Sequence, residues 1–282
     1  MLSIVDPIAE IQRTHGIVGR ADELSMALAV LLCGRHLLLE GPVGVGKTTV
    51  ALAVCAHIGR GVVRVDGDDR YSESKLTGWF DPPLVLAKGY SDDTFFAGPL
   101  VQAMREGSVL FVNELNRMPE AVQNVLLPAL DEGLLIVPRI GEVRAAPGFQ
   151  VVATQNPVEY IATGHLSEAL LDRFEHVGLD YQNADEETEI VRRETGCDDP
   201  ALVDAAVALT RATRSDPRFR KGASVRAAIA MVALAVRSGG GDDALRRAAG
   251  AALPTRVELR DATDSPLPDV LDELVEDTRK KV

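Results

Sequence analysis

A glycine-rich segment at residues 41–48, with the sequence GPVGVGKT, constrains the fold of this chain more than any other feature. It matches the pattern G-x-x-x-x-G-K-[ST], it follows an apolar segment at 37–40, and a helical pattern begins at Lys47. In such a loop the backbone N–H groups turn toward phosphates, the lysine reaches the β- and γ-phosphates, and the hydroxyl faces Mg²⁺. The segment therefore predicts a phosphate-binding loop between a strand and a helix. The alternative is a glycine turn that binds nothing.

Short apolar segments alternate with helical patterns from residue 17 to residue 179, which is typical of a parallel sheet covered by helices. We expect strands at 36–40, 62–66, 108–113, 150–154 and 174–179. We expect helices at 22–32, 47–57, 99–106, 119–132 and 168–171. Two further segments, near 84–97 and 134–145, interrupt the alternation and predict β-hairpins. The first part of the chain is thus expected to be α/β, with a five-stranded parallel sheet and helices on both faces.

The character of the sequence changes after Tyr181, where strand signals stop and Ala, Leu, Glu and Arg dominate. Helical patterns follow at 186–194, 200–214, 223–237, 242–252 and 268–280. We therefore expect two domains, an α/β nucleotide-binding core at 1–181 and a small all-helical domain at 182–282.

The composition excludes several other classes of protein. The net charge of −12 would repel a nucleic-acid backbone. No apolar segment approaches the roughly 20 residues that a membrane-spanning helix needs, and residues 1–12 do not resemble an export signal. The three cysteines, Cys33, Cys55 and Cys197, show no metal-binding or redox spacing. We expect a cytosolic protein with no membrane span and no nucleic-acid partner.

Polar residues that suit phosphate chemistry follow two later strands. Glu114 comes after the expected strand 108–113 and is suited to orient or deprotonate a water molecule. Asn113 stands where a metal-side aspartate is expected, and it keeps an oxygen for the Mg²⁺ water shell without the charge. Asn156 follows strand 150–154 and can reach a γ-phosphate, because parallel strands bind ligands at their carboxyl ends. The alternatives are an ordinary strand-end carboxylate for Glu114 and a turn residue before Pro157 for Asn156.

Taken in order, these motifs resemble those of the AAA+ ATPases and, within them, the MoxR family. The matching segments are 17–20 (IVGR), 41–48 (GPVGVGKT), 113–117 (NELNR), 153–157 (ATQNP), 166–174 (LSEALLDRF) and 222–227 (GASVRA). The resemblance extends from about residue 17 to residue 237. Two positions depart from the family pattern, since Asn113 replaces the usual aspartate and Val225 stands where proline is common. The first departure bears on the rate of hydrolysis.

The resemblance implies roles for individual residues. The implied nucleotide-binding residues are Val18, Gly19, Gly41, Pro42, Gly44, Val45, Gly46, Lys47, Thr48, Thr49 and Arg226, with Val18 and Gly19 lining the adenine pocket. The implied catalytic residues are Lys47, Glu114, Asn156 and Arg173, and the implied metal-site residues are Thr48 and Asn113. Arg173 would reach the γ-phosphate held by a neighbouring subunit. On local sequence alone, Arg173 is instead expected in a surface ion pair.

The resemblance also implies a function, with ATP and Mg²⁺ as cofactors. It implies a hexameric ring that remodels, activates or matures a protein client, including by metallocofactor insertion, together with a partner that carries a von Willebrand factor A domain. The two hairpins would face the central pore of the ring. A second hypothesis is an ATP-gated assembly switch, in which Asn113 slows hydrolysis. A DNA-threading motor is disfavoured by the acidic charge.

Overall fold

The structure, a computed structural model, describes residues 6–156, 166–239 and 243–280. Pro157, the last residue of the motif at 153–157, lies outside these ranges. The chain forms two compact units: the first comprises residues up to 42 together with 46–180, and the second comprises residues 43–45 together with those from 181 onward. Within the described ranges, no helix combines the length and the apolar character that crossing a bilayer requires.

A five-stranded sheet with the order β2-β5-β8-β1-β9 forms the centre of the first unit. Its strands are β1 (His36–Glu40), β2 (Val62–Asp66), β5 (Val109–Asn113), β8 (Gln150–Gln155) and β9 (Phe174–Gly178). Every neighbouring pair is parallel, which confirms the sheet predicted from the sequence. The carboxyl ends of all five strands consequently lie along one edge.

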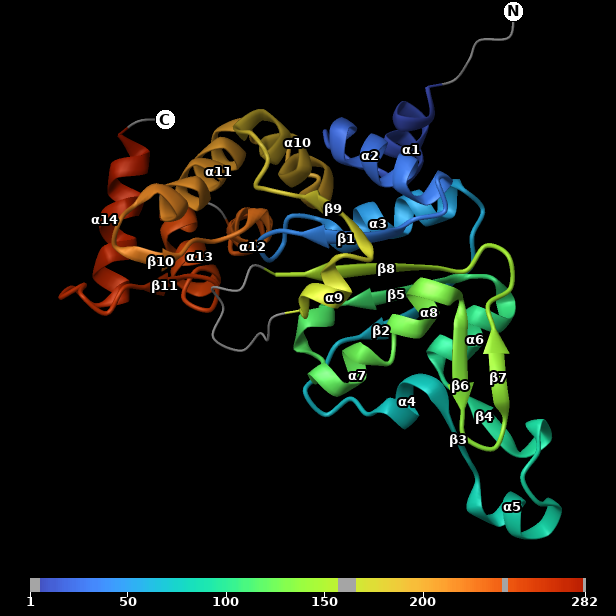
Figure 1. Ribbon diagram of the computed structural model, residues 1–282. Helices are drawn as coiled ribbons and strands as arrows, with labels where there is room; N and C mark the ends of the chain where they lie inside the picture. Colours follow the sequence, from blue (N-terminus) through green and yellow to red (C-terminus); the bar gives the residue numbers. More distant parts are fainter. Residues whose placement is uncertain (1–5, 157–165, 240–242, 281–282) are drawn as a thin grey trace, which may run out of the picture. The chain divides into compact units, whose positions relative to one another are not determined.

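Helices cover both faces of this sheet (Figure 1). On one face lie α2 (Ala21–Leu32) and α3 (Lys47–His57), preceded by α1 (Pro7–His15). On the other lie α6 (Pro99–Glu106), α7 (Glu120–Asn124) and α8 (Leu127–Glu132). The first four residues of β5 are fully buried, and successive side chains of a strand point to opposite faces. The continuous apolar sequence of β5 therefore reflects burial on both faces.

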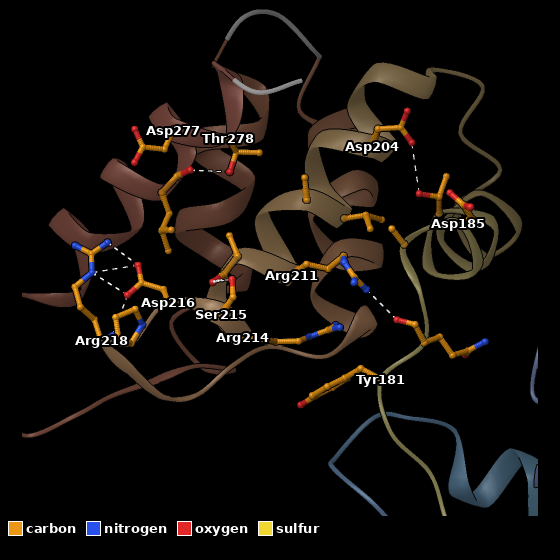
Figure 2. A pocket seen from close by; sticks show the side chains of 18 residues that line it. Tyr181, Asp185, Asp204, Arg211, Arg214, Ser215, Asp216, Arg218, Asp277 and Thr278 are labelled. Atoms are coloured by element: carbon orange, nitrogen blue, oxygen red, sulfur yellow. Dashed lines mark hydrogen bonds and ion pairs between the residues drawn. The ribbon is translucent and has the colours of Figure 1, made fainter.

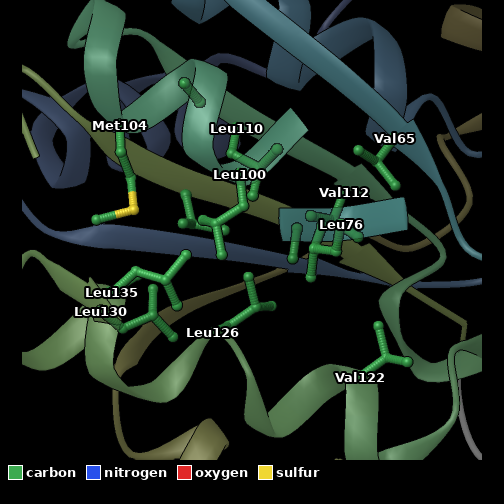
Figure 3. Packing of buried hydrophobic residues seen from close by; sticks show 14 of the residues in the cluster. Val65, Leu76, Leu100, Met104, Leu110, Val112, Val122, Leu126, Leu130 and Leu135 are labelled. Atoms are coloured by element: carbon green, nitrogen blue, oxygen red, sulfur yellow. The ribbon is translucent and has the colours of Figure 1, made fainter. Parts of the chain in front are cut away.

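The core on the second of these faces joins α6 to the sheet and to the α7–α8 segment (Figure 3). Leu100 and Met104 of α6 pack in the same cluster as Leu110 of β5 and Leu126, which precedes α8. All four side chains are completely buried. This packing holds strand β5 in place, and with it the polar residues that follow the strand.

The segment between β2 and β5 differs from the hairpin predicted at 84–97. Residues 84–87 lie in helix α5 (Pro82–Lys88), and β4 (Phe95–Ala97) pairs instead with β3 (Gly78–Phe80). Prolines begin α5, where proline favours the first helical turn because its fixed φ suits the helix and no N–H is needed there. A short helix α4 (Glu73–Thr77) precedes β3, and a 3-10 turn (Asp92–Thr94) precedes β4.

The next segment also departs from the sequence prediction in one respect. The helix predicted at 119–132 is divided into α7 and α8, because Pro128 has no N–H to donate to the carbonyl of Asn124. The following residues form an antiparallel hairpin of β6 (Leu134–Val137) and β7 (Gly141–Arg144), within the region 134–145. The helix α9 (Glu168–Leu171) then begins after Ser167, whose side chain accepts a hydrogen bond from the backbone N–H of Leu170.

The second unit is helical but not entirely so. Its helices are α10 (Ala184–Thr195), α11 (Pro200–Ser215), α12 (Val225–Arg237), α13 (Ala244–Ala252) and α14 (Leu267–Arg279). The prediction of an all-helical domain is wrong in one detail, since β10 (Phe219–Lys221) pairs with β11 (Glu258–Leu259). These strands are too short to show an alternating pattern, and their pairing joins segments far apart in the sequence.

The packing of β5 gives a prediction for stability. Leu110→Ala should lower the free energy of unfolding by roughly 2–5 kcal/mol, because it removes a fully buried side chain and leaves a cavity. Chemical denaturation followed by far-ultraviolet circular dichroism measures this change. Leu86→Ala is the matched control, since Leu86 on α5 is 89% exposed and should have almost no effect. Equal losses in the two variants would contradict the described core.

Candidate functional site

The loop at residues 41–46 joins β1 to α3 in the first unit. Gly44 and Gly46 have φ angles of +82° and +96°, a backbone region that side chains other than glycine rarely adopt. At Gly41 a Cβ atom would lie 2.0 Å from the backbone oxygen of Leu179, so a larger residue does not fit there. These glycines let the loop turn tightly before the first turn of α3, and the N-terminal end of a helix favours anions.

Lys47 connects this loop to the end of β8. Its ammonium group donates to the backbone oxygens of Gly41 and Pro42, at 2.7 and 2.8 Å, and to Oδ1 of Asn156 at 3.0 Å. Lys47 is only 8% exposed. The ammonium group is thus held between the loop and Asn156, the position expected of a group that contacts a bound phosphate.

Asn113, the last residue of β5, lies among three polar side chains. Its Oδ1 accepts hydrogen bonds from the hydroxyls of Thr48 at 3.3 Å and Thr154 at 3.0 Å. Its Nδ2 donates to Oδ1 of Asp66, the last residue of β2, at 2.9 Å. The Arg64 guanidinium, followed by the Asn113 amide, holds the pKa of the Asp66 carboxyl below its ordinary value. Asp66 is therefore ionised at neutral pH.

Glu114 follows with a left-handed backbone conformation, φ 56° and ψ 50°, which is uncommon outside glycine. Its N–H donates to the hydroxyl of Thr154 at 2.9 Å. One carboxylate oxygen accepts from Nδ2 of Asn156 at 3.1 Å, and the other accepts from Arg117 at 2.7 Å. The carboxylate of Glu114 raises the pKa of Arg117. Both carboxylate oxygens are therefore engaged.

The backbone around Glu114 is tightly packed against the loop that follows β2. Gly67 donates its N–H to the backbone oxygen of Asn113 at 2.7 Å. A Cβ atom on Gly67 would lie 2.1 Å from the backbone oxygen of Glu114, so this close approach requires glycine. The contact helps to hold Glu114 in its left-handed conformation, and unusual backbone conformations of this kind often occur at functional sites.

The structure thus brings together Lys47, Thr48, Asn113, Glu114 and Asn156, each linked to another by a hydrogen bond. Thr49 lies exposed on the next position of α3. Val18 and Gly19 lie between α1 and α2, where the side chain of Gln12 donates to the Gly19 carbonyl at 2.6 Å. Arg226 lies in the first turn of α12, in the second unit. The roles of these residues stay predictions.

Arg173 is not joined to the group around Lys47 by any contact that the structure gives. Its Nε and one terminal nitrogen bind the two oxygens of Asp131, at 2.7 and 2.9 Å, and the other terminal nitrogen donates to the carbonyl of Ala169. Asp131 lies in α8, and Arg173 lowers the pKa of its carboxyl. Arg173 is thus in a surface ion pair, as expected from the local sequence, but the partner Asp131 lies 42 positions away in the chain.

Three residues that the sequence analysis did not assign belong to the same site: Asp66, Arg117 and Thr154. Asp66 and Thr154 each occupy the end of an expected strand, which was the available signal. The sequence alone does not give the strand order, so it could not place β2 beside β5. Arg117 lies within the recognised segment 113–117, but its contact with Glu114 depends on a 3-10 turn (Leu115–Arg117) that has no periodic signature.

A separate cavity of about 970 Å³ lies within the second unit, between α10, α11 and α14 (Figure 2). Its arginines are engaged by neighbouring groups. Arg211 donates to the carbonyl of Gln182 at 2.9 Å, Arg218 binds both oxygens of Asp216, and Arg214 lies over the ring of Tyr181 at 3.8 Å. None of the predicted nucleotide-binding residues lines this cavity.

Much of this chain is similar in sequence to known proteins. A family model described as an AAA domain of the dynein-related subfamily matches residues 36–174. The gas vesicle ATPase GvpN of Haloferax mediterranei is 33% identical over 212 residues, covering 70% of this chain and 60% of that protein. Protein NorQ of Paracoccus denitrificans is 33% identical over 181 residues, covering 64% of this chain and 65% of that protein. The chain therefore spans less than two thirds of either relative.

A third relative is matched over more of its length. The uncharacterised protein SH1500 of Staphylococcus haemolyticus is 30% identical over 209 residues, which cover 72% of this chain and 79% of that protein. Among solved structures, NtrX of Brucella abortus superimposes with a TM-score of 0.59 at 20% identity, covering 94% of this chain and 62% of NtrX.

The RuvB branch migration motor of Thermotoga maritima superimposes with a TM-score of 0.55 at 20% identity, covering 83% of this chain and 70% of RuvB. At such identities, the structural likeness to NtrX and RuvB shows the fold alone. The relatives in sequence go further, because they are 30 to 33% identical over 64 to 72% of this chain. The chain belongs to the AAA+ ATPases and, within them, to the MoxR-like family.

Proposed function

We propose that this chain binds ATP with Mg²⁺ at residues 41–48 and hydrolyses the ATP within a ring of identical subunits. The observation that carries the proposal is the hydrogen-bonded group of Lys47, Thr48, Asn113, Glu114 and Asn156 at one edge of the sheet. AAA+ ATPases as a family hydrolyse ATP, and the related fold of NtrX was solved in complex with ADP. The same edge offers a cation, a hydroxyl and a carboxylate within reach of one another.

Lys47 supplies the positive charge for the phosphates. The oxygens of Gly41, Pro42 and Asn156 to which it donates are uncharged, and phosphate oxygens are stronger acceptors because their hydrogen bonds are assisted by charge. Phosphate oxygens of an incoming nucleotide can therefore replace these acceptors of the Lys47 ammonium group.

Thr48 and Asn113 fit a magnesium ion. Mg²⁺ commonly uses only one or two protein groups and completes its shell with phosphates and water. The hydroxyl of Thr48 donates its proton to Asn113, so its lone pairs stay available for the ion. When bound, the ion would neutralise the charge that develops on the phosphates during transfer.

Glu114 is the group that orients the attacking water. Its carboxylate is held by Asn156 on one side and by Arg117 on the other. Each oxygen keeps a second lone pair, so the carboxylate can accept a proton from water while these two contacts hold it in place. Asn156 also contacts Lys47, so phosphate binding at Lys47 is a direct way to disturb the Glu114 contact.

Arg173 acts on the nucleotide of a neighbouring subunit. Within its own chain it is paired with Asp131 and is at the surface, where a neighbour can approach. Exposed ion pairs contribute little to stability, so exchange of Asp131 for a phosphate is not opposed by a large cost. This role requires assembly, and we propose a hexameric ring.

We further propose that the ring remodels or activates a protein client, with a partner that carries a von Willebrand factor A domain. Large apolar side chains are exposed on the segments inserted before and after β5. Trp79 of β3 stacks on Phe96 of β4, and Leu86 of α5 and Ile136 of β6 are 89% and 72% exposed. Exposed apolar groups of this kind suit contact with a protein.

We also propose a cytosolic location. The free thiols of Cys33, Cys55 and Cys197 fit a reducing cytosol.

A second function, an ATP-gated assembly switch, is favoured by a specific observation. Asn113 carries no charge where the family has a carboxylate, and the Glu114 carboxylate is held by Arg117. Both features slow hydrolysis without weakening ATP binding. Single-turnover kinetics distinguish the two functions, since a switch holds ATP much longer than assembly takes.

The first prediction from this proposal concerns nucleotide binding. Lys47→Ala should abolish measurable ATP affinity, because the loop loses the side chain that brings positive charge to the phosphates. Titration calorimetry measures the affinity. Lys88→Ala is the control, since Lys88 lies exposed at the end of α5 and its removal should leave ATP binding intact. Unchanged ATP binding by the Lys47→Ala protein would remove the basis of the proposed site.

The second prediction concerns hydrolysis across the subunit interface. Arg173→Ala should still bind ATP but lose activity by roughly 10³ to 10⁵, the usual contribution of an arginine finger. Glu114→Gln should also bind ATP and fail to hydrolyse it. Steady-state ATPase assays of the assembled proteins measure both losses.

Mixing the two inactive variants tests whether Arg173 acts in trans. Activity should partly return, because some interfaces combine the intact Glu114 of one subunit with the intact Arg173 of the other. The control replaces the Glu114→Gln protein with a variant that carries Glu114→Gln and Arg173→Ala together, and it should give no rescue. The absence of rescue in the first mixture, with assembly unchanged by sedimentation, would contradict action between subunits.

A further inference from the structure

The amide of Asn113 poses a question of orientation that an aspartate would not. The two oxygens of a carboxylate are equivalent, whereas an amide has an accepting end and a donating end. Asn113 meets three side chains, the hydroxyls of Thr48 and Thr154 and the carboxylate of Asp66. A hydroxyl can donate or accept, but an ionised carboxylate can only accept. Asp66 is therefore the neighbour that decides which way the amide lies.

The surrounding hydrogen bonds agree with this orientation. The hydroxyl of Thr154 already accepts the N–H of Glu114 at 2.9 Å, so its single proton is directed to Oδ1 of Asn113 at 3.0 Å. The proton of Thr48 also goes to Oδ1. If the amide were reversed, its donating end would face the two threonines and its oxygen would face the negative charge of Asp66.

Arg64 keeps Asp66 in place at the edge of the sheet. Both residues belong to β2, two positions apart and on the same face, and the guanidinium contacts the carboxylate at 2.8 to 3.3 Å. The same contact fixes the direction in which the carboxylate oxygens point. Asp66 is thus a fixed, charged acceptor for the Nδ2 of Asn113.

We propose that Asp66 is a positioning residue that turns the oxygen of Asn113 toward Thr48, so that Thr48 can present its lone pairs to the metal ion. The inference rests on the proposed binding of Mg²⁺ with the nucleotide. Both lone pairs of Oδ1 are used by the two threonines, so Asn113 acts on the ion through Thr48. Asp66 and Asn113 together replace the single aspartate of the family.

This arrangement predicts how the substitution Asn113→Asp affects Mg²⁺ binding. A new carboxylate at position 113 would lie about as close to Asp66 as the present amide nitrogen, which is 2.9 Å away. Two carboxylates at such a distance repel each other, so the new side chain would turn away from Asp66 or push it aside. Restoring the usual aspartate should therefore fail to strengthen Mg²⁺ binding unless Asp66 is removed as well.

The test is a double-mutant cycle of Asp66→Ala and Asn113→Asp, measured on the full chain. Calorimetry gives the affinity for ADP with Mg²⁺ and with EDTA, and the ratio of the two isolates the contribution of the metal ion. Asp66→Ala alone should reduce this ratio by about fivefold to tenfold, at the lower end for a charge-assisted hydrogen bond because Asp66 is exposed. In the Asn113→Asp background, the same replacement should raise the ratio.

Asp69→Ala is the matched control, since it removes the same charge from the exposed loop directly after β2 and should leave the ratio unchanged. Asp66→Asn keeps an accepting oxygen but not the charge. Its affinity ratio should lie between those of Asp66→Ala and Asp69→Ala. Thermal unfolding establishes that each variant is folded.

An equal fall in the ratio in both backgrounds would overturn the inference, because Asp66 would then act only through its charge. An unchanged ratio in Asp66→Ala would overturn it as well. If the wild-type protein bound no ADP under either condition, the proposed function would fail and this inference with it. If the wild-type protein binds ADP normally but Asp66→Ala does not raise the ratio in the Asn113→Asp background, only this inference is overturned and the proposed function stands.

Discussion

Three adjacent parallel strands determine where the polar residues of this protein meet. β5, β8 and β1 are neighbours in the sheet, with β2 outside β5. Paired strands lie about 4.8 Å apart, so side chains at the ends of neighbouring strands are within hydrogen-bonding reach. Asp66 and Asn113 are the last residues of β2 and β5, Thr154 is the second-last residue of β8, and the loop before Lys47 follows β1. A different strand order would separate the same residues.

The site is built on threonines and amides as much as on charged groups. Thr154 illustrates this, because it accepts from the backbone of Glu114 and donates to Asn113. One buried hydroxyl thereby connects the proposed water-orienting residue to the proposed metal-site residue. Hydrogen bonds shared in this way position neighbouring groups together, so a change at one member is expected to alter the others. The Asn-for-Asp replacement at position 113 is accommodated within this network.

The segments inserted before and after β5 differ from the polar site, because they expose large apolar side chains. In the first of them, prolines begin a helix where apolar residues suggested a strand, and β4 finds its partner in β3. The stacked rings of Trp79 and Phe96 lie across this pair and remain about half exposed. Exposed aromatic residues add little to the stability of the unit itself. Their presence on the short β3–β4 pair supports a role in contact with another protein, as proposed above.

The sequence by itself determined the α/β class, the five strands of the sheet and the phosphate-binding loop, because each depends on local patterns. Burial of β5 on both faces makes its sequence continuously apolar, and the glycines at 44 and 46 reflect backbone angles that only glycine adopts readily. Only the tertiary structure decided the β3–β4 and β10–β11 pairs, the pairing of Arg173 with Asp131 and the contact of Asp66 with Asn113. Each of these joins residues that are distant along the chain, and their contact follows from strand order and helix packing, which no local pattern encodes.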